Sequence, residues 1–334
     1  MHRTPVISAE QGTAAGSALI APTFQVRVAE RHTAADGVVV LEFERPDGGD
    51  LPEWSPGAHV DVVLGQGMVR QYSLCGDPDE RKRWRIAVSR EPDGRGGSAY
   101  VHDSLALETN VTVSEPRNHF ELEGSNRYMF VAGGIGITPL LAMIRSARVQ
   151  GASWHLHYGG RTRSSMAFTE ELTAAFGDRV TIYPQDEVGL LDLPSILAQP
   201  DPDTLIYCCG PESLIEAVES RCPGWAKASL RVERFHPKQQ ADPTQDGAFE
   251  VELARSGTTV LVAAGQSVLD AVRAAGVPVA SSCEEGTCGT CEVAVLDGDV
   301  DHRDSILSPD EQAANDAMFI CVSRARCPRL VLDL

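Results

Sequence analysis

The sequence predicts a multidomain protein in which an antiparallel β-barrel is followed by an α/β domain with a parallel sheet and then by a small α+β domain. Three observations support this fold class. Short alternating runs between Gly, Pro and Asp turns begin at Phe24, strand-then-helix units begin at Tyr128, and a Pro- and Gln-rich stretch at 236–247 precedes further strands. A chain of 334 residues is long enough to give two or three domains a core each.

The barrel is expected over residues 23–123. Its candidate strands are short runs bounded by turn residues, a pattern typical of an antiparallel sheet. They read F-Q-V-R-V (24–28), V-V-V-L-E-F (38–43), H-V-D-V-V-L (59–64), R-Q-Y-S-L (70–74), W-R-I-A-V (84–88) and V-T-V-S-E-P (111–116), with F-E-L (120–122) closing the domain. Residues 1–22 are rich in Ala, Ser and Gly and have no apolar period, so we expect a disordered tail there.

The α/β domain is expected over residues 124–235. Its candidate strands alternate with helices, which predicts a parallel sheet covered by helices. They read Y-M-F-V-A-G-G (128–134), W-H-L-H-Y (154–158), V-T-I-Y (180–183) and T-L-I-Y-C-C-G-P (204–211). Residues 236–247 are expected to form a linker. The third domain, 248–334, begins with F-E-V-E-L and T-V-L-V and an Ala-rich helix near Ser267–Ala275.

Four cysteines in the third domain carry the strongest chemical signal. The run S-S-C-E-E-G-T-C-G-T-C-E contains Cys283, Cys288 and Cys291, and Cys321 follows thirty positions later. The spacing C-x4-C-x2-C…C is that of a plant-type [2Fe–2S] cluster held by four thiolates. Such a loop must turn sharply while directing backbone N–H groups at sulfur, which explains the two glycines between the ligands, Gly286 and Gly289. The sequence therefore predicts an electron-transfer protein.

Two other interpretations of these cysteines are a zinc site and a set of structural thiols. Zinc sites usually combine two separate C-x2-C-like pairs, whereas this loop offers three ligands in nine residues. Disulfides are disfavoured because nine is an odd number of cysteines and no secretory signal is visible. The cysteines outside the motifs, Cys75, Cys208, Cys222 and Cys327, are most simply reduced thiols in a cytoplasmic protein.

The net charge of −18 argues against nucleic acid and anionic membranes as partners. No apolar run approaches the length of a membrane span, so we expect a soluble protein. Residues 242–334 carry sixteen Asp and Glu against six Lys and Arg, a net charge of −10. This acidity serves either solubility or the docking of a basic partner near the cluster loop, where Glu284, Glu285, Glu292 and Asp297–Asp301 lie.

Two glycine turns indicate a nucleotide site in the α/β domain. In F-V-A-G-G-I-G-I-T-P-L-L, a buried strand ends in a glycine turn, and Thr138 and Pro139 are predicted as the N-cap and first residue of a helix. Such a helix start directs backbone N–H groups at a pyrophosphate, although a purely structural turn is equally compatible with the loop alone. Cys209-Gly210-Pro211 forms a second strand-to-helix turn. Both turns are expected at the carboxyl edge of one sheet, where they face one ligand.

The barrel contains a second candidate ligand site. In R-Q-Y-S-L, strand alternation places Arg70, Tyr72 and Leu74 on one face and Gln71 and Ser73 on the other. An arginine and an aromatic ring suit a flat ligand that bears phosphate. The run G-R-G-G-S at 94–98 offers glycines that cradle a phosphate, with a simple Gly-rich hairpin as the alternative.

The order of these motifs resembles the phthalate dioxygenase reductase and vanillate demethylase reductase family, which belongs to the ferredoxin–NADP reductase superfamily and has a C-terminal plant-type ferredoxin domain of β-grasp fold. The resemblance covers residues 24–334 and rests on R-Q-Y-S-L, G-R-G-G-S, A-G-G-I-G-I-T-P, C-C-G-P, C-E-E-G-T-C-G-T-C, D-H-R-D and C-V-S-R-A…L-V-L-D-L. It implies a flavin-binding barrel, an NAD-binding domain and a [2Fe–2S] domain.

The resemblance also implies roles for individual residues. Flavin contacts fall on the R-Q-Y-S run and on the phosphate loop, that is on Arg70, Gln71, Tyr72, Ser73, Gly96, Gly97 and Ser98. The nicotinamide nucleotide falls on Gly134, Gly136, Thr138, Pro139, Cys209, Gly210 and Pro211. Ser73 near the flavin N5 and Cys209 against the nicotinamide are the catalytic candidates, although the neighbouring Cys208 is an alternative to Cys209. Phe235 is expected to cover the flavin ring, or else to be a core aromatic at the end of a domain.

The number of electrons that each cofactor accepts indicates the order in which they act. Reduced nicotinamide gives two electrons as hydride and a [2Fe–2S] cluster takes one, so a flavin is needed between them. We therefore expect a reductase component that passes electrons from NADH through FMN and the cluster to a separate Rieske-type oxygenase. A cytochrome P450 partner, and NADPH or FAD in place of NADH or FMN, are alternatives. A flavin-free sensory module and a self-contained oxygenase are the other classes considered. The first conflicts with the flavin and nucleotide motifs, and the second with the lack of a haem-type or mononuclear iron spacing among the nine histidines.

Overall fold

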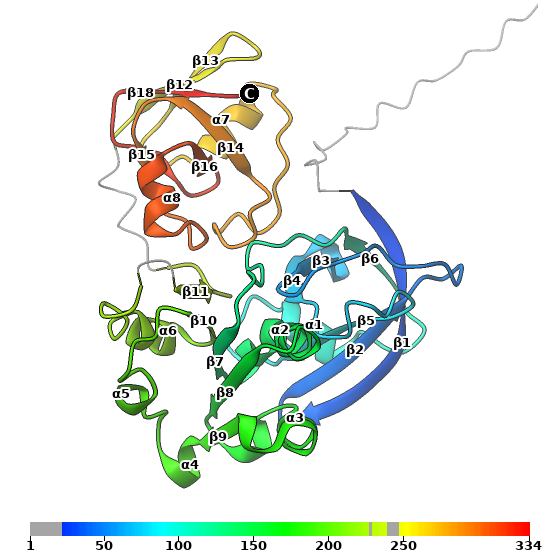
Figure 1. The fold of residues 1–334 in the computed structure, drawn as a ribbon. Coiled ribbons are helices and arrows are strands. Elements are labelled where there is room, and N and C mark those ends of the chain that lie inside the picture. Colours follow the sequence, from blue (N-terminus) through cyan, green and yellow to red (C-terminus); the bar gives the residue numbers. More distant parts are fainter. Residues whose placement is uncertain (1–21, 227–228, 239–246) are drawn as a thin grey trace, which may run out of the picture.

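The computed structural model describes residues 22–226, 229–238 and 247–334. The predicted disordered tail, up to residue 21, and most of the predicted linker lie outside these residues. The described part forms three large sheets that follow one another along the chain, as the sequence predicts (Figure 1). A two-stranded sheet accompanies the third of them. No helix in these ranges combines the length and apolar character needed to cross a membrane.

The first sheet is antiparallel and has the strand order β4-β3-β6-β1-β2-β5. Its strands are β1 (Thr23–Ala35), β2 (Val38–Glu44), β3 (His59–Val63), β4 (Val69–Ser73), β5 (Trp84–Ser89) and β6 (Asn110–Ser114), with a 3-10 turn η1 (Gly65–Gly67) and a helix α1 (Gly97–Asp103). The two end strands, β4 and β5, come into contact, so the sheet curls into a barrel. No ladder joins β4 to β5, which leaves one edge of β4 free to hydrogen-bond a ligand.

Three details of this barrel differ from the sequence expectation. Strand β1 extends to Ala35 instead of ending near Val28, because two register shifts allow one long strand to pair with β6 and then with β2. The F-E-L run at 120–122 forms no strand. The Gly-rich run at 94–98 is no hairpin; it leads into helix α1 through Gly96, whose φ of 81° is a left-handed value that favours glycine.

The second sheet is parallel and has the order β11-β10-β7-β8-β9. Its strands are β7 (Arg127–Gly133), β8 (Ser153–Gly160), β9 (Val180–Pro184), β10 (Thr204–Cys209) and β11 (Leu230–Glu233). The connecting helices are η2 (Gly134–Gly136), α2 (Ile137–Val149), η3 (Arg163–Ser165), α3 (Thr169–Phe176), η4 (Gly177–Arg179), α4 (Gln185–Val188), α5 (Leu193–Ile196) and α6 (Glu212–Glu219). Helices α2 and α3 cover one face, and α5 and α6 cover the other.

One apolar cluster spans the boundary between the barrel and the parallel sheet, and the interior of the barrel has a cluster of its own. Val38, Val40 and Ala87 of the barrel belong to the same buried cluster as Tyr128 and Phe130 of β7. Burial of a continuous apolar surface is the dominant favourable contribution to such packing. These two domains are therefore packed on each other like parts of a single domain.

The third domain has a mixed sheet of order β13-β12-β18-β14-β16 and a small pair, β15-β17. The strands are β12 (Phe249–Leu253), β13 (Thr258–Val262), β14 (Glu292–Asp297), β15 (Val300–Asp301), β16 (Ala317–Phe319), β17 (Arg324–Ala325) and β18 (Arg329–Leu332), and the helices are α7 (Val268–Ala274) and α8 (Pro309–Ala314). Its apolar cluster is drawn from residues 249–334 alone. In Figure 1 the long loop between α7 and β14 extends from this domain toward strands β3 and β4 of the barrel.

Candidate functional site

The four predicted cluster ligands come together in the third domain. Cys283, Cys288 and Cys291 lie on the loop between α7 and β14, and Cys321 follows β16, which pairs with β14. Three of the side chains are buried, with exposed fractions of 1% for Cys288, 3% for Cys291 and 8% for Cys321. The thiols form two contacting pairs, Cys283 with Cys288 and Cys291 with Cys321.

The donors around the sulfur atoms fit an iron–sulfur cluster. The backbone N–H of Glu285 donates to Cys283 Sγ at 3.3 Å. The hydrogen bond between the Cys283 and Cys288 thiols lowers the pKa of Cys283 and raises that of Cys288, so the pair shares one proton. Both loop glycines have positive φ, 72° at Gly286 and 73° at Gly289, as the predicted sharp turns require.

The grouping of the thiols also fits a binuclear cluster. Two cysteine pairs suit a [2Fe–2S] cluster, in which four thiolates are divided between two irons.

Strand β4 and the phosphate loop lie together at the edge of the barrel. The Arg70 guanidinium donates to the carbonyl oxygen of Arg95 at 2.8 Å. A Cβ on Gly97 would lie 2.6 Å from Arg70 Cγ, so only glycine permits this approach. The Ser98 hydroxyl accepts from the backbone N–H of Glu91. The structure thus places the guanidinium of Arg70 beside Gly96 and Gly97, a fitting arrangement for a phosphate group.

The alternation expected along β4 is confirmed by its pairing with β3. Tyr72 lies opposite Val60, and burial raises the pKa of Tyr72 to about 12, so its hydroxyl stays protonated. Ser73, exposed by 6%, lies opposite His59. The amide of Gln71 hydrogen-bonds Asp61 and Ser282 of the cluster loop, and its flavin contact stays a prediction.

The two glycine turns of the parallel sheet pack directly on each other. Strands β7 and β10 are neighbours, with Cys209 opposite Ala132. A Cβ on Gly136 would lie 2.3 Å from the carbonyl oxygen of Cys209, and one on Gly210 would lie 2.9 Å from Gly133 Cα. Both turns lie at the carboxyl edge of the sheet, where open α/β sheets bind ligands.

The start of helix α2 corrects one detail of the sequence expectation. The helix begins at Ile137 with Gly136 as its N-cap, so Thr138 and Pro139 lie within its first turn. The Thr138 hydroxyl donates to the carbonyl oxygen of Ile135 at 2.9 Å and therefore does not cap the helix.

The neighbouring cysteines of β10 point to opposite faces of the sheet. Cys208 belongs to the cluster beneath α6, and Cys209 to the cluster beneath α2. The Cys209 thiol lies beside a carboxylate, with 4.0 Å between Sγ and Glu233 Oε2. Burial raises the pKa of Cys209 well above its ordinary value, so this thiol is neutral.

Glu233 is a candidate site residue that the sequence reasoning missed. It ends the short edge strand β11, and burial raises its pKa to about 8. A carboxyl group with a perturbed pKa beside Cys209 is a candidate for a functional role. Phe235, two residues later, is 36% exposed and belongs to no core cluster, unlike a core aromatic.

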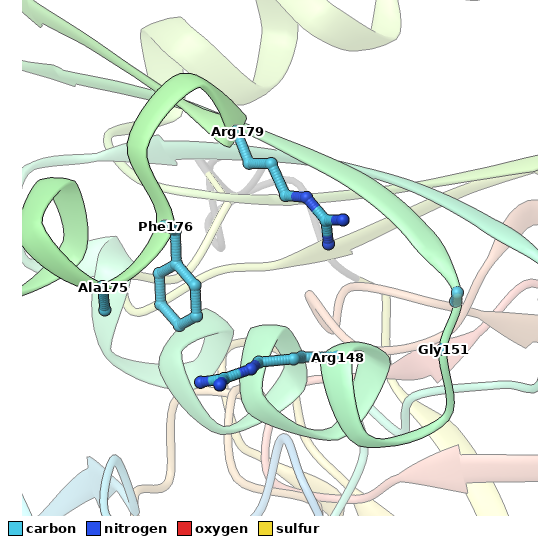
Figure 2. A pocket seen from close by; sticks show the side chains of 6 residues that line it. Arg148, Gly151, Ala175, Phe176 and Arg179 are labelled. Carbon is cyan, nitrogen blue, oxygen red and sulfur yellow. The ribbon is translucent and has the colours of Figure 1, made fainter.

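A separate cavity of about 320 Å³ lies at the other end of α2 (Figure 2). It is lined by Arg148, Gly151, Ala152, Ala175, Phe176 and Arg179. The guanidinium of Arg148 lies 5.7 Å from the Phe176 ring centre, and that of Arg179 lies 5.6 Å from Trp154. Cation–π contacts of this kind stabilise the packing of the side chains that form them. None of the predicted site residues lines this cavity.

Comparison with known proteins agrees with this arrangement. Residues 130–220 match the oxidoreductase NAD-binding domain, and residues 251–326 match the 2Fe-2S iron-sulfur cluster binding domain. The chain is 44% identical over 302 residues to the phenoxybenzoate dioxygenase subunit beta of Ectopseudomonas oleovorans, a match that covers 90% of this chain and 94% of that protein.

Two solved structures extend the comparison. The structure of phthalate dioxygenase reductase is 37% identical with a TM-score of 0.69, over 93% of this chain and 98% of that one. An intact type IV self-sufficient cytochrome P450 monooxygenase is 42% identical with a TM-score of 0.89. That match covers all of this chain and 43% of the P450 chain, so this chain spans less than half of that protein.

The fold and the site define an NAD(P)H-dependent oxidoreductase that combines a flavin domain with a plant-type [2Fe–2S] domain. The chain belongs to the phthalate dioxygenase reductase family of oxygenase reductase components.

The raised pKa of Glu233 makes stability dependent on pH. The unfolded carboxyl titrates near 4.5 and the folded one near 8, so stability is fully present below pH 4.5 and declines as the pH rises toward 8. Glu233→Gln removes the titrating carboxyl group and with it this contribution to the pH dependence of stability. From pH 5 to pH 8 the free energy of unfolding should fall by roughly 2 to 4 kcal/mol more in the wild type than in the variant, as measured by chemical denaturation.

Glu216→Gln, which alters an exposed carboxylate on the neighbouring helix α6, is the matched control and should keep the wild-type pH profile. Parallel profiles for the wild type and Glu233→Gln would show that the Glu233 carboxyl keeps an ordinary pKa.

Proposed function

We propose that this chain takes hydride from NADH, passes the electrons through FMN and the [2Fe–2S] cluster, and delivers them singly to the Rieske-type oxygenase component of a multicomponent system. One observation carries the proposal: the cluster loop contacts strand β4 directly, through Gln71 and Ser282. The predicted flavin strand and the predicted cluster ligands are therefore immediate neighbours, as transfer between them requires.

In this proposal the residues of the chain bind and orient the nicotinamide nucleotide and the flavin. The glycine turns at Gly136 and Gly210 leave room for the nicotinamide nucleotide at the sheet edge, and Cys209 with Glu233 forms the protonated end of that site. Arg70 and Gly97 hold the flavin phosphate, and the free edge of β4 offers main-chain hydrogen bonds to the ring. Bound flavin accepts two electrons as hydride and releases them one at a time to the cluster.

A cytochrome P450 is the second candidate for the electron acceptor. The observation in its favour is the likeness to the reductase portion of a self-sufficient P450, at 42% identity and a TM-score of 0.89. The oxygenase proposal draws instead on relatives whose whole length this chain covers, among them the phthalate 4,5-dioxygenase reductase subunit of Pseudomonas putida. Reduction of a purified Rieske-type oxygenase and of a P450, measured side by side, distinguishes the two.

The flavin is proposed to be FMN. Support comes from the family resemblance, and the Arg70 side chain beside Gly97 is chemically suited to a flavin phosphate. We expect that flavin released by heat from purified protein comigrates with FMN on chromatography, in a one-to-one ratio with the polypeptide. A stoichiometric FAD peak would overturn this assignment.

The proposed preference for NADH draws on charges at the end of β8. The sequence there, G-G-R-T-R-S-S, has two arginines and lacks the acid that usually holds a ribose 2′-hydroxyl. In the structure the acidic residues come from helix α4, which follows strand β9. The backbone N–H of Asp186 donates to the Arg161 carbonyl at 3.2 Å, and Arg163 forms a bidentate pair with Glu187 at 2.6 and 2.9 Å. The Glu187 carboxylate that is paired with Arg163 disfavours a 2′-phosphate there.

For NADH over NADPH we expect at least about a tenfold advantage in kcat/KM, equivalent to about 1.4 kcal/mol. Glu187→Gln should narrow the ratio by freeing Arg163, chiefly through a lower KM for NADPH. Glu170→Gln, which alters an exposed carboxylate on α3, is the control and should leave the ratio unchanged. A wild type that prefers NADPH, or a Glu187→Gln variant with the wild-type ratio, would contradict the assignment.

The structure shows which of the carboxylates expected in the acidic docking face are paired with arginines. Glu284 pairs with Arg273 at 2.7 Å within its own domain, and Glu285 pairs with Arg95 of the barrel at 2.7 Å. Each carboxylate is paired with an arginine, and the predicted role of both in docking stays a prediction. The exposed carboxylates of Glu292 and Asp316 lie close enough that Asp316 helps to raise the pKa of Glu292, after the larger effect of burial. We propose that these two contribute to the face that meets a basic partner.

Removal of one cluster ligand tests the proposed electron path. Cys288 is buried in the third domain, whereas hydride transfer occurs between the first two. Cys288→Ala should abolish the cluster signal and lower the reduction of the oxygenase to near background, while NADH still bleaches the flavin at close to the wild-type rate. Loss of flavin reduction in a folded, flavin-loaded Cys288→Ala protein would contradict the modular path.

A further inference from the structure

A polar junction joins the barrel to the loop that carries the cluster ligands. On the barrel side, His59 and Asp61 of β3 share one face with Gln71 of β4, because they pair directly across the two strands. The junction consists of His59, Asp61, Gln71, Arg117 and His119 of the barrel and of Ser282 and Gly289 of the cluster loop. No role in flavin, nucleotide or iron binding accounts for most of these residues.

A buried ion pair forms the centre of the junction. The Asp61 side chain is fully buried, and its Oδ1 accepts from Arg117 Nη2 at 2.7 Å and from Gln71 Nε2 at 2.9 Å. Burial opposes ionisation of Asp61, but the neighbouring Arg117 lowers its pKa, so the carboxylate is charged. A buried pair of this kind is directional and loses several kcal/mol when one partner is removed.

This ion pair extends across the domain boundary. Gln71 Nε2, which donates to Asp61, also donates to Ser282 Oγ at 2.8 Å. Ser282 immediately precedes the ligand Cys283. The charge on β3 is therefore connected by hydrogen bonds to a residue adjacent to a cluster ligand.

A steric contact fixes the other end of the loop. A Cβ on Gly289 would lie 2.0 Å from His119 Nε2, so the loop approaches the barrel as closely as a glycine permits. The ring of His59 faces the main chain of Cys288, the residue before it. Positive φ and close approach both restrict this position to glycine.

The composition of the junction argues against a role in stability alone. Asp61 Oδ2, His59 Nε2 and Arg117 Nε are buried, and none has a hydrogen-bond partner among the described residues. Replacing such a network with apolar side chains is often neutral or stabilising. By contrast, apolar side chains form the boundary between the barrel and the parallel sheet. The polar boundary instead restricts the loop to one orientation.

We propose that this polar junction is a positioning element for electron transfer, which holds the Cys283–Cys288 side of the cluster loop against the strands that carry the flavin. The inference rests on the proposed function and extends it to residues that contact neither cofactor. The exposed Arg95–Glu285 pair contributes little, since surface ion pairs are worth at most about 1 kcal/mol.

Substitutions on the two sides of the boundary test the proposal in the intact holoprotein. Asp61→Asn removes the charge on the barrel side, and Ser282→Ala removes the hydroxyl on the loop side. Stopped-flow absorbance after mixing with NADH follows flavin bleaching and cluster reduction separately. Each variant should bleach its flavin within about twofold of the wild-type rate and with an unchanged KM for NADH. Cluster reduction should be slower by about tenfold, since a 1 Å misplacement costs up to about a hundredfold.

Two comparisons separate positioning from general destabilisation. Ser282→Thr keeps the hydroxyl and should restore most of the rate. The double variant should be about as slow as the slower single variant, because both changes break one network. Asp47→Asn removes a carboxylate that is paired with Arg45 in the barrel, and this control should behave as wild type.

Wild-type cluster reduction in folded, fully loaded Asp61→Asn and Ser282→Ala proteins would overturn the proposal, and so would effects that multiply in the double variant. If Asp61→Asn does not fold, the comparison of Ser282→Ala with Ser282→Thr decides alone. Failure of NADH to bleach the wild-type flavin would instead refute the proposed function.

Discussion

Electron transfer between the flavin and the cluster depends on how the loop at 282–291 is held against the barrel. In this chain the contact is polar and directional: a buried Asp61–Arg117 pair is linked through Gln71 to Ser282. Gly289 permits the close approach to His119 that completes it. The loop therefore has two tasks, since its cysteines bind the cluster and its other residues dock the domain.

The two domain boundaries of the molecule are built differently. The barrel and the parallel sheet share an apolar core, which fixes the flavin strand relative to the nicotinamide turns. The third domain keeps its own core and contacts the barrel through polar groups. Apolar packing suits a permanent arrangement in which hydride must move over a short distance. Polar contacts specify an orientation and contribute less to net stability.

Much of the architecture was predictable because it depends on local pattern. Strand alternation, glycine turns and cysteine spacing identified the three domains, and the β4 alternation around Tyr72 was confirmed by the register with β3. Contacts between distant segments were not predictable. The amide of Gln71, for example, lies between Asp61 and Ser282, a residue 211 positions later. Glu233 was missed because a lone glutamate on a short edge strand carries no local signal; its raised pKa arises from tertiary burial.

The central claim is that the cluster is already docked on the flavin domain before electrons arrive. The most direct measurement is the rate of cluster reduction after flavin bleaching, followed by stopped flow in buffers of increasing viscosity. A docked cluster requires no movement of the third domain, so the rate should be independent of viscosity. A rate that falls in proportion to viscosity would show that the domain must first move into position, and would contradict the account.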